Sequence, residues 1–475
     1  MKNNLFENPE SNTSRSGAEN GRPIWRPVTE NLECLAIAIA MALMLKFFLI
    51  EAYKIPTGSM QPTIIGNEER GIFDRVLVNK FIYLLSDPER WDVIVFKYPL
   101  DQSKNYIKRL VGLPGEKVTI QGGDIYIDDR IERKPEEAIN AVLKKIYPVK
   151  NEENAFSGFF SVEGDLKIPD EEHLIFQGPC IARTKRPIKS NYFDGYDPDY
   201  QIPEPRIHVE ESHRVGDLRI AFEVRLHEST GGIRAVITER GKRHTYFLRG
   251  EARTGASYME TSAGGAGKVW SDPDVVLKTG KAHKVAFSHI DDRLSIRLDG
   301  TEVAWYEYDD EVWSSSTSRD NGIEFASVGC GADFEGLAVY RDIYYLSGRN
   351  GSIPVSYHVP PSHYFAMGDN TQNSADSRLW RSSEYTLADG RVIEGSSDQI
   401  HQQGYYANSD PDRGDRDGFL FTDIYGDQVF LPRSELKDPY PRQMDKNFIP
   451  KKLMMGKAMV VFWPIYPHFR WKLLR

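Results

Sequence analysis

The chain contains one short stretch that is rigid at both ends and carries a single serine hydroxyl: Ile55-Pro56-Thr57-Gly58-Ser59-Met60-Gln61-Pro62-Thr63. Pro56 and Pro62 each fix φ and do not fit a helix interior, so the stretch is expected to be an extended turn. Such a turn holds the hydroxyl of Ser59 in one place. Because serine is a weak nucleophile at neutral pH, Ser59 becomes reactive only beside a base.

The candidate base lies in the apolar segment Tyr106-Ile107-Lys108-Arg109-Leu110-Val111. A lysine is a base only when it is neutral, which requires its pKa to fall from about 10.4 by roughly two to three units. Burial in an apolar strand supplies that shift, because removal from water disfavours the charged amine. Successive strand residues point to opposite faces, so Arg109 is expected to point away from Lys108. Taken alone, such a pair is usually solvated; beside the Ser59 stretch it predicts a serine–lysine dyad.

Four further blocks follow in order along the chain, at residues 90–96, 106–116, 368–378 and 456–458. Together with the Ser59 stretch, which follows an apolar segment, they resemble successive motifs of bacterial signal peptidase I, the serine–lysine protease family that removes signal peptides. The resemblance covers residues 31–134, roughly 355–381 and roughly 446–463. It implies a membrane-bound serine endopeptidase with Ser59 as nucleophile and Lys108 as general base.

The same resemblance implies roles for residues around the dyad. Ser374 matches a hydroxyl that orients the lysine amine, and Asp376 with Arg378 matches an ion pair that holds this loop. The backbone N–H of Ser59 and the hydroxyl of Thr57 would stabilise the oxyanion.

Substrate recognition is expected to use strand edges, because an extended peptide can pair with an exposed edge and place alternate side chains in pockets. The family resemblance implies small residues at the first and third positions before the cut. The apolar residues expected to form shallow pockets for them are Ile55, Pro56, Met60, Val95 and Ile107.

An apolar run over residues 34–50 would span about 26 Å as a helix at about 1.5 Å per residue, close to the thickness of a bilayer core. Its small residues lie inside the run rather than after it, which favours a retained anchor over a cleaved signal peptide. A buried soluble helix is the other interpretation, because the run is short for a span. We expect a transmembrane helix over 31–50. The family resemblance implies that the tail 1–30 lies in the cytoplasm and the rest on the periplasmic side of the bacterial inner membrane, and the cations of the tail agree with the positive-inside tendency.

The length of 475 residues exceeds what one hydrophobic core usually serves and implies two or three domains. Alternating strands with an Asp299-Gly300 hairpin turn favour a β-sandwich insertion, which loosely resembles concanavalin- or laminin-G-like jelly rolls. The expected fold is therefore mainly β, with a signal-peptidase-type β catalytic domain interrupted by this sandwich. No assigned catalytic residue lies in the sandwich, so we expect it to be dispensable for cleavage.

The expected boundaries follow from shifts in composition along the chain. The tail 1–30 is expected to be disordered, and a helix over 135–146 to begin the first insertion. The second insertion is expected to be an exposed loop with short hairpins. After the membrane helix, the expected order is the first segment of the catalytic core (51–134), an insertion or linker (135–204), the sandwich (205–347), the second segment of the catalytic core (348–381), a second insertion (382–445), and the end of the catalytic core with an interfacial tail (446–475).

Charge and composition exclude several classes of function. The net charge of −9 and pI near 5.8 give no general attraction to nucleic acid, so none is expected as a partner. The three cysteines lack disulfide-framework or metal-type spacing, and no phosphate loop or HExxH motif occurs. We therefore expect neither a cofactor nor a metal. The expected partners are signal peptides of secreted preproteins and membrane lipid, while no ligand is indicated for the sandwich.

Two other functions are alternative interpretations of the same sequence. The first is an inactive peptidase scaffold that presents a glycan- or protein-binding β-sandwich. The complete set of Ser59, Lys108 and Ser374 argues against a loss of activity. The second is a self-cleaving repressor with the same dyad, but such proteins are soluble and need a DNA-binding domain.

Overall fold

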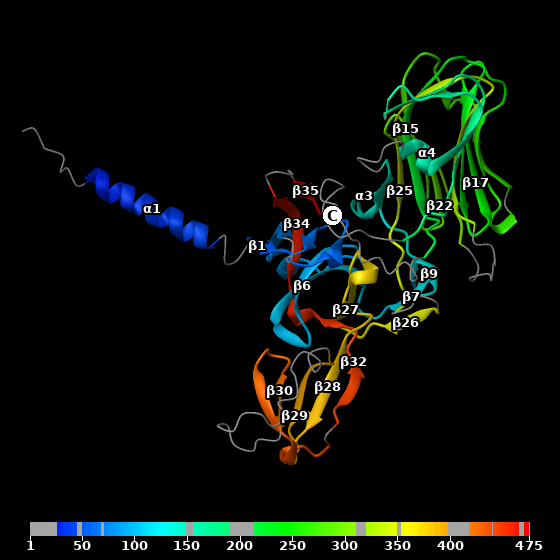
Figure 1. The fold of residues 1–475 in the computed structure, drawn as a ribbon. Helices are drawn as coiled ribbons and strands as arrows, with labels where there is room; N and C mark the ends of the chain where they lie inside the picture. The colour runs from blue at the N-terminus through cyan, green and yellow to red at the C-terminus, as the bar shows by residue number, and fades with distance from the viewer. Residues whose placement is uncertain are drawn as a thin grey trace, which may run out of the picture. The chain divides into compact units, whose positions relative to one another are not determined.

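The computed structural model describes residues 26–44, 50–67, 71–148, 155–170, 172–190, 213–265, 267–309, 320–348, 353–397, 418–438, 440–464 and 470–474. The chain divides into two compact units, Met1–Ile50 and Glu51–Arg475. The second unit consists mostly of β-strands, which confirms the predicted mainly β fold class (Figure 1).

The first unit contains helix α1 (Arg26–Met44), which overlaps the predicted membrane helix 31–50. The helix begins within the tail 1–30, so residues 26–30 are helical and not disordered as expected. Residues 45–49, near the end of that prediction, lie outside the described residues, as does the predicted tail up to residue 25. Where the structure describes the chain, no helix has the combined length and apolar character needed to cross a bilayer. The large apolar side chains of α1 that are more than half exposed are Leu32, Leu35, Ile37, Ile39 and Met41.

The second unit is built on one eight-stranded sheet, here called the core sheet, with the order β1-β4-β34-β5-β6-β27-β33 and β35 paired with β34. It joins distant parts of the chain, because β34 near the carboxyl end lies between β4 and β5. Figure 1 shows β34 in red among the blue strands of the amino-terminal part. Short apolar runs at 75–78, 93–96 and 106–111 predict strands, and the structure confirms them within β4, β5 and β6. The bounds are β1 Ile50–Lys54, β4 Arg75–Asn79, β5 Val93–Tyr98, β6 Asp101–Gly112, β27 His363–Met367, β33 Ile449–Pro450, β34 Met454–Trp463 and β35 Lys472–Leu473.

A separate four-stranded sheet has the order β26-β7-β8-β9, and its strands β7, β8 and β9 follow β6 in sequence. The pair Gly122-Gly123 between two apolar runs predicts a hairpin. The structure confirms it, since both glycines have positive φ (66° and 106°) between β7 and β8. The bounds are β7 Lys117–Gln121, β8 Asp124–Ile127, β9 Arg130–Ile131 and β26 Val355–His358.

The predicted insertion forms a β-sandwich of two eight-stranded sheets. The first has the order β12-β13-β25-β15-β21-β22-β23, with β10 paired with β25; the second has the order β11-β14-β24-β16-β17-β18-β19, with β20 paired with β17. Asp299 and Gly300, both at positive φ, form the predicted turn between β22 and β23. Buried aromatic side chains from both sheets fill the interior, including Phe160, Phe176, Phe287, Phe325 and Phe334.

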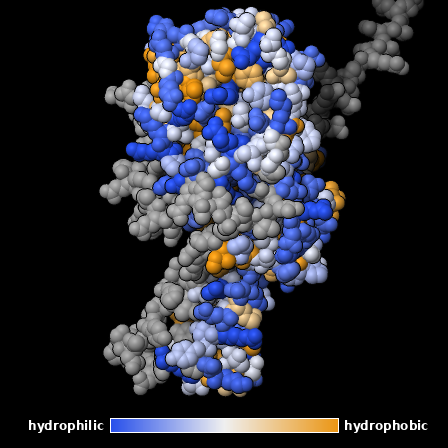
Figure 2. All heavy atoms as spheres, turned by 90° about the vertical axis from the view of Figure 1, so that its right-hand side faces the viewer, coloured by the Kyte–Doolittle hydropathy of each residue, from blue (hydrophilic) through white to orange (hydrophobic). Residues whose placement is uncertain are grey.

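The first sheet contains β10 Lys144–Tyr147, β12 Leu166–Lys167, β13 His173–Phe176, β15 Leu218–Leu226, β21 His283–Ile290, β22 Arg293–Leu298, β23 Thr301–Glu307 and β25 Ala332–Arg341. The second contains β11 Phe160–Glu163, β14 Cys180–Thr184, β16 Gly232–Glu239, β17 Lys242–Gly250, β18 Ser257–Thr261, β19 Gly267–Asp272, β20 Val276–Leu277 and β24 Gly322–Val328. Figure 1 shows the long strands of the two sheets side by side. The surface seen in Figure 2 is mostly hydrophilic, with hydrophobic residues scattered over it.

The structure differs from the sequence-based expectation in the segment 135–204. The helix expected over 135–146 ends earlier, as α3 (Glu136–Val142), because Lys144–Tyr147 pairs with β25. The strands β10 to β14, which precede residue 205, all belong to the two sandwich sheets, and α4 (Ala155–Phe159) lies among them in sequence. The sandwich therefore begins before the expected boundary, and residues 191–212 lie outside the described residues.

The second insertion contains more than a loop. A three-stranded sheet has the order β29-β28-β32, and β30 pairs with β31 as a hairpin. The side chains of Tyr385, Leu387, Phe421 and Leu431 form a separate buried cluster here. The bounds are β28 Arg381–Thr386, β29 Val392–Ser396, β30 Gly418–Thr422, β31 Gln428–Pro432 and β32 Arg442–Asp445, while residues 398–417 are not described.

The chain enters and leaves the sandwich at adjacent points. Lys144 and Arg341 are register partners on β10 and β25. Next to them, Lys134 forms buried ion pairs with Asp291 (2.5 Å) and with Asp342 (2.9 Å). Asp291 directly follows the sandwich strand β21, and Lys134 follows β9 of the four-stranded sheet. This ion pair therefore connects the sandwich to the segment after the four-stranded sheet.

Candidate active site

Ser59 lies in the short 3-10 turn Gly58–Met60, which follows β1. Thr57 before it is extended (φ −119°, ψ 155°), as the two flanking prolines predict. The turn is held by hydrogen bonds from the backbone N–H groups of Gln61 to Gly58 O (3.2 Å) and of Ile64 to Met60 O (2.9 Å). Ser59 is therefore fixed on a rigid turn, with only 7% of its surface exposed.

Lys108 reaches this turn from the middle of the core sheet. It lies on β6, where it is the register partner of Ile94 on β5. Its Nζ donates hydrogen bonds to Ser59 Oγ (2.8 Å) and to the carbonyl oxygen of Ile107 (3.1 Å). The structure thus brings together the serine and the lysine that the sequence singled out, and both are buried.

The surroundings of Lys108 favour its neutral form. Burial lowers the pKa of Lys108 to about 8, although the nearby carboxylates of Asp376 and Asp369 act in the opposite direction and Arg378 adds to the lowering. A lysine with this pKa is partly deprotonated close to neutral pH. The amine can therefore accept a proton from the hydroxyl that it contacts.

Arg109 points away from the dyad, as strand alternation predicts, but it is fully buried rather than solvated. Its Nε and Nη2 each donate to the Asp369 carboxylate at 2.8 Å, and its Nη1 donates to the Trp91 carbonyl oxygen at 2.9 Å. Asp369 also accepts a hydrogen bond from the hydroxyl of Thr63. The sequence Gly368-Asp369-Asn370 predicts only a turn, so this ion pair was missed. The adjacent Lys-Arg pair inside an apolar run was the available signal.

The loop 368–378 packs directly on the Ser59 turn. The backbone N–H of Asn370 donates to Ser59 O (3.1 Å), and its side-chain Nδ2 donates to Gly58 O (3.2 Å). Gly368 allows this approach, because a Cβ at that position would lie 2.4 Å from Ser59 O and 2.2 Å from Ser374 Oγ. Asn370 and Gly368 therefore set the distance between the loop and the serine, a role that the sequence did not indicate.

Asp376 and Arg378 form the buried ion pair expected from the family resemblance. Arg378 donates from Nε to Asp376 Oδ1 and from Nη2 to Asp376 Oδ2, both at 2.7 Å. Burial alone would raise the pKa of Asp376, but Arg378, the Gly368 N–H and Lys108 together lower it. The same guanidinium donates to the carbonyl oxygens of Thr371 (3.0 Å) and Leu346 (2.9 Å). Arg378 is therefore the centre of the hydrogen bonds that hold this loop.

Ser374 and Thr57 lie near the dyad but are placed differently. The Ser374 hydroxyl is buried and makes no hydrogen bond to any residue that the structure describes, so it is not bonded to Lys108. Thr57 is exposed, and its Oγ1 lies 3.5 Å from Ser59 Oγ. Both hydroxyls are thus available to other groups at the site.

Four of the five residues expected to contact substrate lie in one buried apolar cluster: Ile55, Met60, Val95 and Ile107. Ile107 is the most exposed of the four, at 9%. These four side chains, here called the apolar floor, form a nearly fully buried apolar surface. Pro56, which follows Ile55 in the chain, is exposed.

Metal-type ligand atoms occur elsewhere among the described residues. Two groups are close enough to hold an ion, Glu239 with His244 and His289, and Asp124 with Asp217 and Asp291. Neither includes a residue of the dyad. The chemistry available at the dyad is therefore that of a serine hydroxyl and a lysine amine.

A model of the family "Signal peptidase, peptidase S26" matches residues 28–178 and 307–396, just over half of the chain. Among solved structures, a carbohydrate binding module (CBM66) from Bacillus subtilis is 10% identical, with a TM-score of 0.25, covering 38% of this chain and 92% of that one. At that TM-score the likeness carries no functional argument.

Curated relatives carry the name signal peptidase I. The protein from Rickettsia bellii (strain OSU 85-389) is 33% identical over 148 residues, which are 28% of this chain and 47% of the relative. The protein from Rickettsia prowazekii (strain Madrid E) is 35% identical over 123 residues, covering 23% of this chain and 47% of the relative. The chain thus spans about half the length of the curated relatives it matches. On the match to the family model, the chain belongs to the signal peptidase family, peptidase S26.

Proposed function

We propose that this chain is a membrane-bound serine endopeptidase that removes signal peptides from exported preproteins. The observation that carries the proposal is the 2.8 Å hydrogen bond between Lys108 Nζ and Ser59 Oγ in a buried site. A buried amine with a pKa of about 8 supplies a neutral base at that distance. Membership of the signal peptidase family supports the same activity.

Catalysis begins when neutral Lys108 removes the proton from Ser59 Oγ, which attacks the carbonyl carbon of the scissile peptide bond. The backbone N–H of Ser59 and the hydroxyl of Thr57 stabilise the oxyanion of the tetrahedral intermediate. Lys108 then gives its proton to the leaving amine, and an ester remains on Ser59. Water, deprotonated by Lys108, hydrolyses this ester and restores the serine.

The loop 368–378 positions the base. The buried pair of Asp376 and Arg378 fixes the loop, and Ser374 on the same loop has a hydroxyl that no described residue uses. In the proposed mechanism this hydroxyl orients the Lys108 amine toward Ser59. Ser374, Asp376 and Arg378 are thus positioning residues rather than reacting groups.

The proposed substrate is the extended end of a signal peptide. It would pair with a strand edge beside Ser59 and place side chains on the apolar floor formed by Ile55, Met60, Val95 and Ile107, next to Pro56. The floor is apolar and exposes little surface, which suits short apolar side chains, and the family resemblance implies the same preference. This favours small residues at the first and third positions before the cut.

A membrane anchor fits this substrate, and we place it at residues 31–50, in the inner membrane of a bacterium. The exposed apolar side chains of α1, such as Leu35 and Ile37, support this placement, because lipid would cover them. The tail 1–30 would be cytoplasmic, and the site would face the periplasm. Membrane lipid and signal peptides are then the partners of the chain.

The test is cleavage of a model preprotein by the purified full chain in detergent. We expect one cut after the signal peptide by the wild type and none by Ser59→Ala or Lys108→Ala, because nucleophile and base act as a unit. The double variant should be no less active than either single variant. If the folded wild type cuts no preprotein, or if Lys108→Ala retains substantial turnover, the proposal is wrong. In the first case, an inactive scaffold becomes the better interpretation.

A further inference from the structure

The sandwich contains a cluster of metal-type ligands that the proposed peptidase mechanism does not use: Glu239, His244 and His289. Glu239 ends β16, and His244 follows on β17 after a tight turn at Arg240 and Gly241, which both have positive φ (47° and 81°). His289 lies on β21 in the other sheet. The three side chains therefore meet between the two sheets of the sandwich.

Each histidine in this cluster uses only one of its ring nitrogens. His244 Nδ1 lies 2.9 Å from Thr261 Oγ1, and His289 Nε2 lies 2.8 Å from the Tyr308 hydroxyl. The remaining nitrogens, His244 Nε2 and His289 Nδ1, have no hydrogen-bond partner among the residues that the structure describes, and both side chains are fully buried. A buried polar atom needs a partner, such as a water molecule or an ion, and here two such nitrogens lie in the same cluster.

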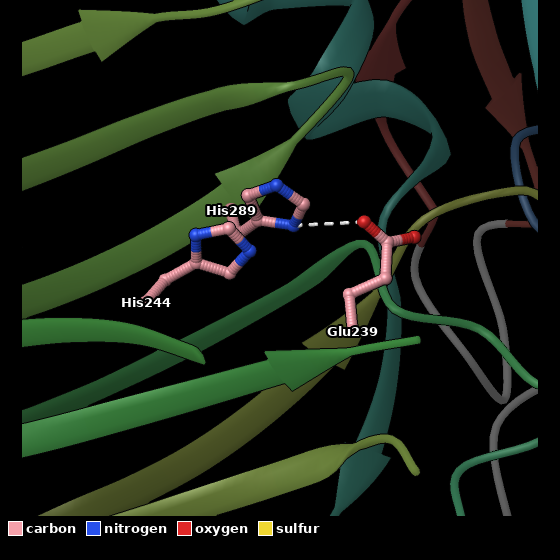
Figure 3. Close-up of side chains that lie close together, drawn as sticks. All are labelled: Glu239, His244 and His289. Atoms are coloured by element: carbon pink, nitrogen blue, oxygen red, sulfur yellow. Dashed lines mark ion pairs between the residues drawn. The ribbon is translucent and has the colours of Figure 1, made fainter. Parts of the chain in front are cut away.

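The two unpartnered nitrogens face the same carboxylate. The imidazole rings of His244 and His289 are stacked, with centroids 4.1 Å apart and planes within 10°. Figure 3 shows Glu239 beyond their common edge, and the ligand atoms of all three residues lie within 4.8 Å of one another. The cluster thus surrounds a single point.

The spacing of these atoms fits an ion better than direct hydrogen bonds. His289 Nδ1 is 3.7 Å from Glu239 Oε2 and 3.8 Å from Asp217 Oδ1, which is too long for a hydrogen bond. Two ligands at about 2.0–2.1 Å from a tetrahedral zinc ion are roughly 3.4 Å apart. To bind one ion, these atoms must move inward and the two stacked rings must also tilt, because the lone pair of a ring nitrogen lies in the plane of its ring.

The carboxylates next to the histidines point to a cation. Asp217 lies with Asp124 and Asp291 in a second group whose oxygens are within 4.8 Å of one another. Carboxylates this close repel one another unless one is protonated or a cation lies between them. Lys134 pairs with Asp291, and Arg240 lies close enough to Asp124, Asp217 and Glu239 for their charges to act on it. An ion at the histidines would offset the negative charge that these two cations leave.

We propose that Glu239, His244 and His289 bind one divalent transition-metal ion of the zinc type, with Asp217 as the fourth ligand. Imidazole with carboxylate favours zinc over magnesium or calcium, which take oxygen ligands. The contacts of Thr261 and Tyr308 with the far ring nitrogens are the partners that fix the ring orientation of metal-binding histidines. The ion would join the two sheets of the sandwich close to Asp291, where Lys134 joins the sandwich to the rest of the chain.

No metal was expected from the sequence, because these ligands do not form a short motif. Glu239 and His244 are separated by a turn, while His289 and Asp217 come from strands of the other sheet or their ends. Only the folded sandwich brings the four residues together.

The test is zinc binding by the full chain without an affinity tag, in detergent and after removal of metals with a chelator. Calorimetric titration with Zn²⁺ should give one equivalent for the wild type, and X-ray absorption should show nitrogen and oxygen at about 2.0–2.1 Å from zinc. Loss of an outer partner of a metal ligand already weakens binding by about 10- to 100-fold, so Glu239→Gln should weaken it by about 100-fold or more. His227→Ala is the matched control, because His227 is an exposed histidine of the same sandwich, paired with Asp333. It should bind zinc as the wild type does.

Zinc should also raise the melting temperature of the wild type and of His227→Ala but not that of Glu239→Gln. His289→Ala should show the same loss; if this buried substitution prevents folding, Glu239→Gln, whose side chain is 12% exposed, still decides the question. The proposal is overturned if the wild type takes up no stoichiometric zinc. It is also overturned if folded Glu239→Gln binds zinc as tightly as the wild type.

Discussion

Arg378 donates a hydrogen bond from Nη1 to the carbonyl oxygen of Leu346, at 2.9 Å. Leu346 belongs to residues 342–347, here called the return segment, through which the chain leaves the last sandwich strand. The hydroxyl of Thr371 donates to the carbonyl oxygen of Tyr344 in the same segment, at 2.7 Å. The loop that packs on Ser59 is therefore tied to the backbone of the return segment, although that segment was expected to belong to the sandwich.

The first prediction concerns how much of the insertion can be removed. We expect a chain in which a short Gly/Ser linker replaces residues 145–340 to retain cleavage of a signal-peptide substrate, because Lys144 and Arg341 are adjacent register partners. Replacement of 205–347 should abolish cleavage, because it removes the return segment and the strands β24 and β25, with which β10, β13 and β14 pair. Cleavage is measured in detergent for both chains.

Circular dichroism and labelling of Ser59 with a serine-directed reagent are the controls for folding. If the chain lacking 145–340 folds and is labelled but does not cleave, the sandwich itself shapes the active site. Full activity after removal of 205–347 would contradict the role of the return segment.

The second prediction is the pH dependence of cleavage. Lys108 is active when deprotonated, so kcat/KM should rise with pH and level off above the pKa of about 8. The rise reflects loss of one proton from the lysine, since the buried site disfavours its charged form. Lys108→Arg should stay inactive over the same range, because a guanidinium is not deprotonated in proteins. A wild-type profile that does not change across pH 8 would contradict the assignment of Lys108 as the base.

The third prediction compares two ion pairs of very different burial. Arg378→Ala leaves Asp376 as a buried charge without its partner, so it should lower the free energy of unfolding by about 3–5 kcal/mol. The matched control is Arg381→Ala, which removes an exposed pair with Asp445 and should cost at most about 1 kcal/mol. Urea denaturation measures both. If Arg378→Ala and Arg381→Ala lower the free energy of unfolding by the same small amount, the Asp376–Arg378 pair does not hold the loop.

The fourth prediction tests the contact between the loop and the Ser59 turn. Gly368→Ala places a Cβ 2.4 Å from Ser59 O, so the turn or the loop must shift and kcat should fall strongly while the protein stays folded. Gly178→Ala is the control, because its Cβ would meet no atom within 4 Å. It should leave both activity and stability unchanged. Normal activity of Gly368→Ala would mean that the turn tolerates displacement of Ser59.

The sequence predicted best those elements whose pattern is local. The strands β4, β5 and β6 and the hairpin at Gly122 and Gly123 each carry their own apolar alternation or turn residues. The strands β10 to β14 were missed because they are short, and because β10, β13 and β14 pair with β24 and β25, which come much later in the sequence. The same pairing ended the helix α3 earlier than its apolar pattern predicted. Pairing between distant segments was therefore the information that the sequence lacked.

Some residues of the candidate site were predicted from the sequence, and others were missed. Ser59 and Lys108 were found from their local motifs, and the structure places them in contact. The pair of Arg109 and Asp369 was missed, because each residue had an adequate local explanation as a surface cation or a turn residue. Nothing in either motif indicated that two charges distant in sequence would meet in the interior. The catalytic roles remain predictions for the experiments above.

The pairing of β6 with β27 sets an order of folding. The whole sandwich lies between these strands in sequence, and closing a long unfolded loop costs entropy and slows the pairing of its ends. A folded sandwich removes most of that cost, since it holds Lys144 and Arg341 side by side. The sandwich should therefore fold before β27 and the loop 368–378 reach Lys108. A chain whose synthesis or translocation stops within the sandwich would contain the serine and the lysine but no assembled site around them.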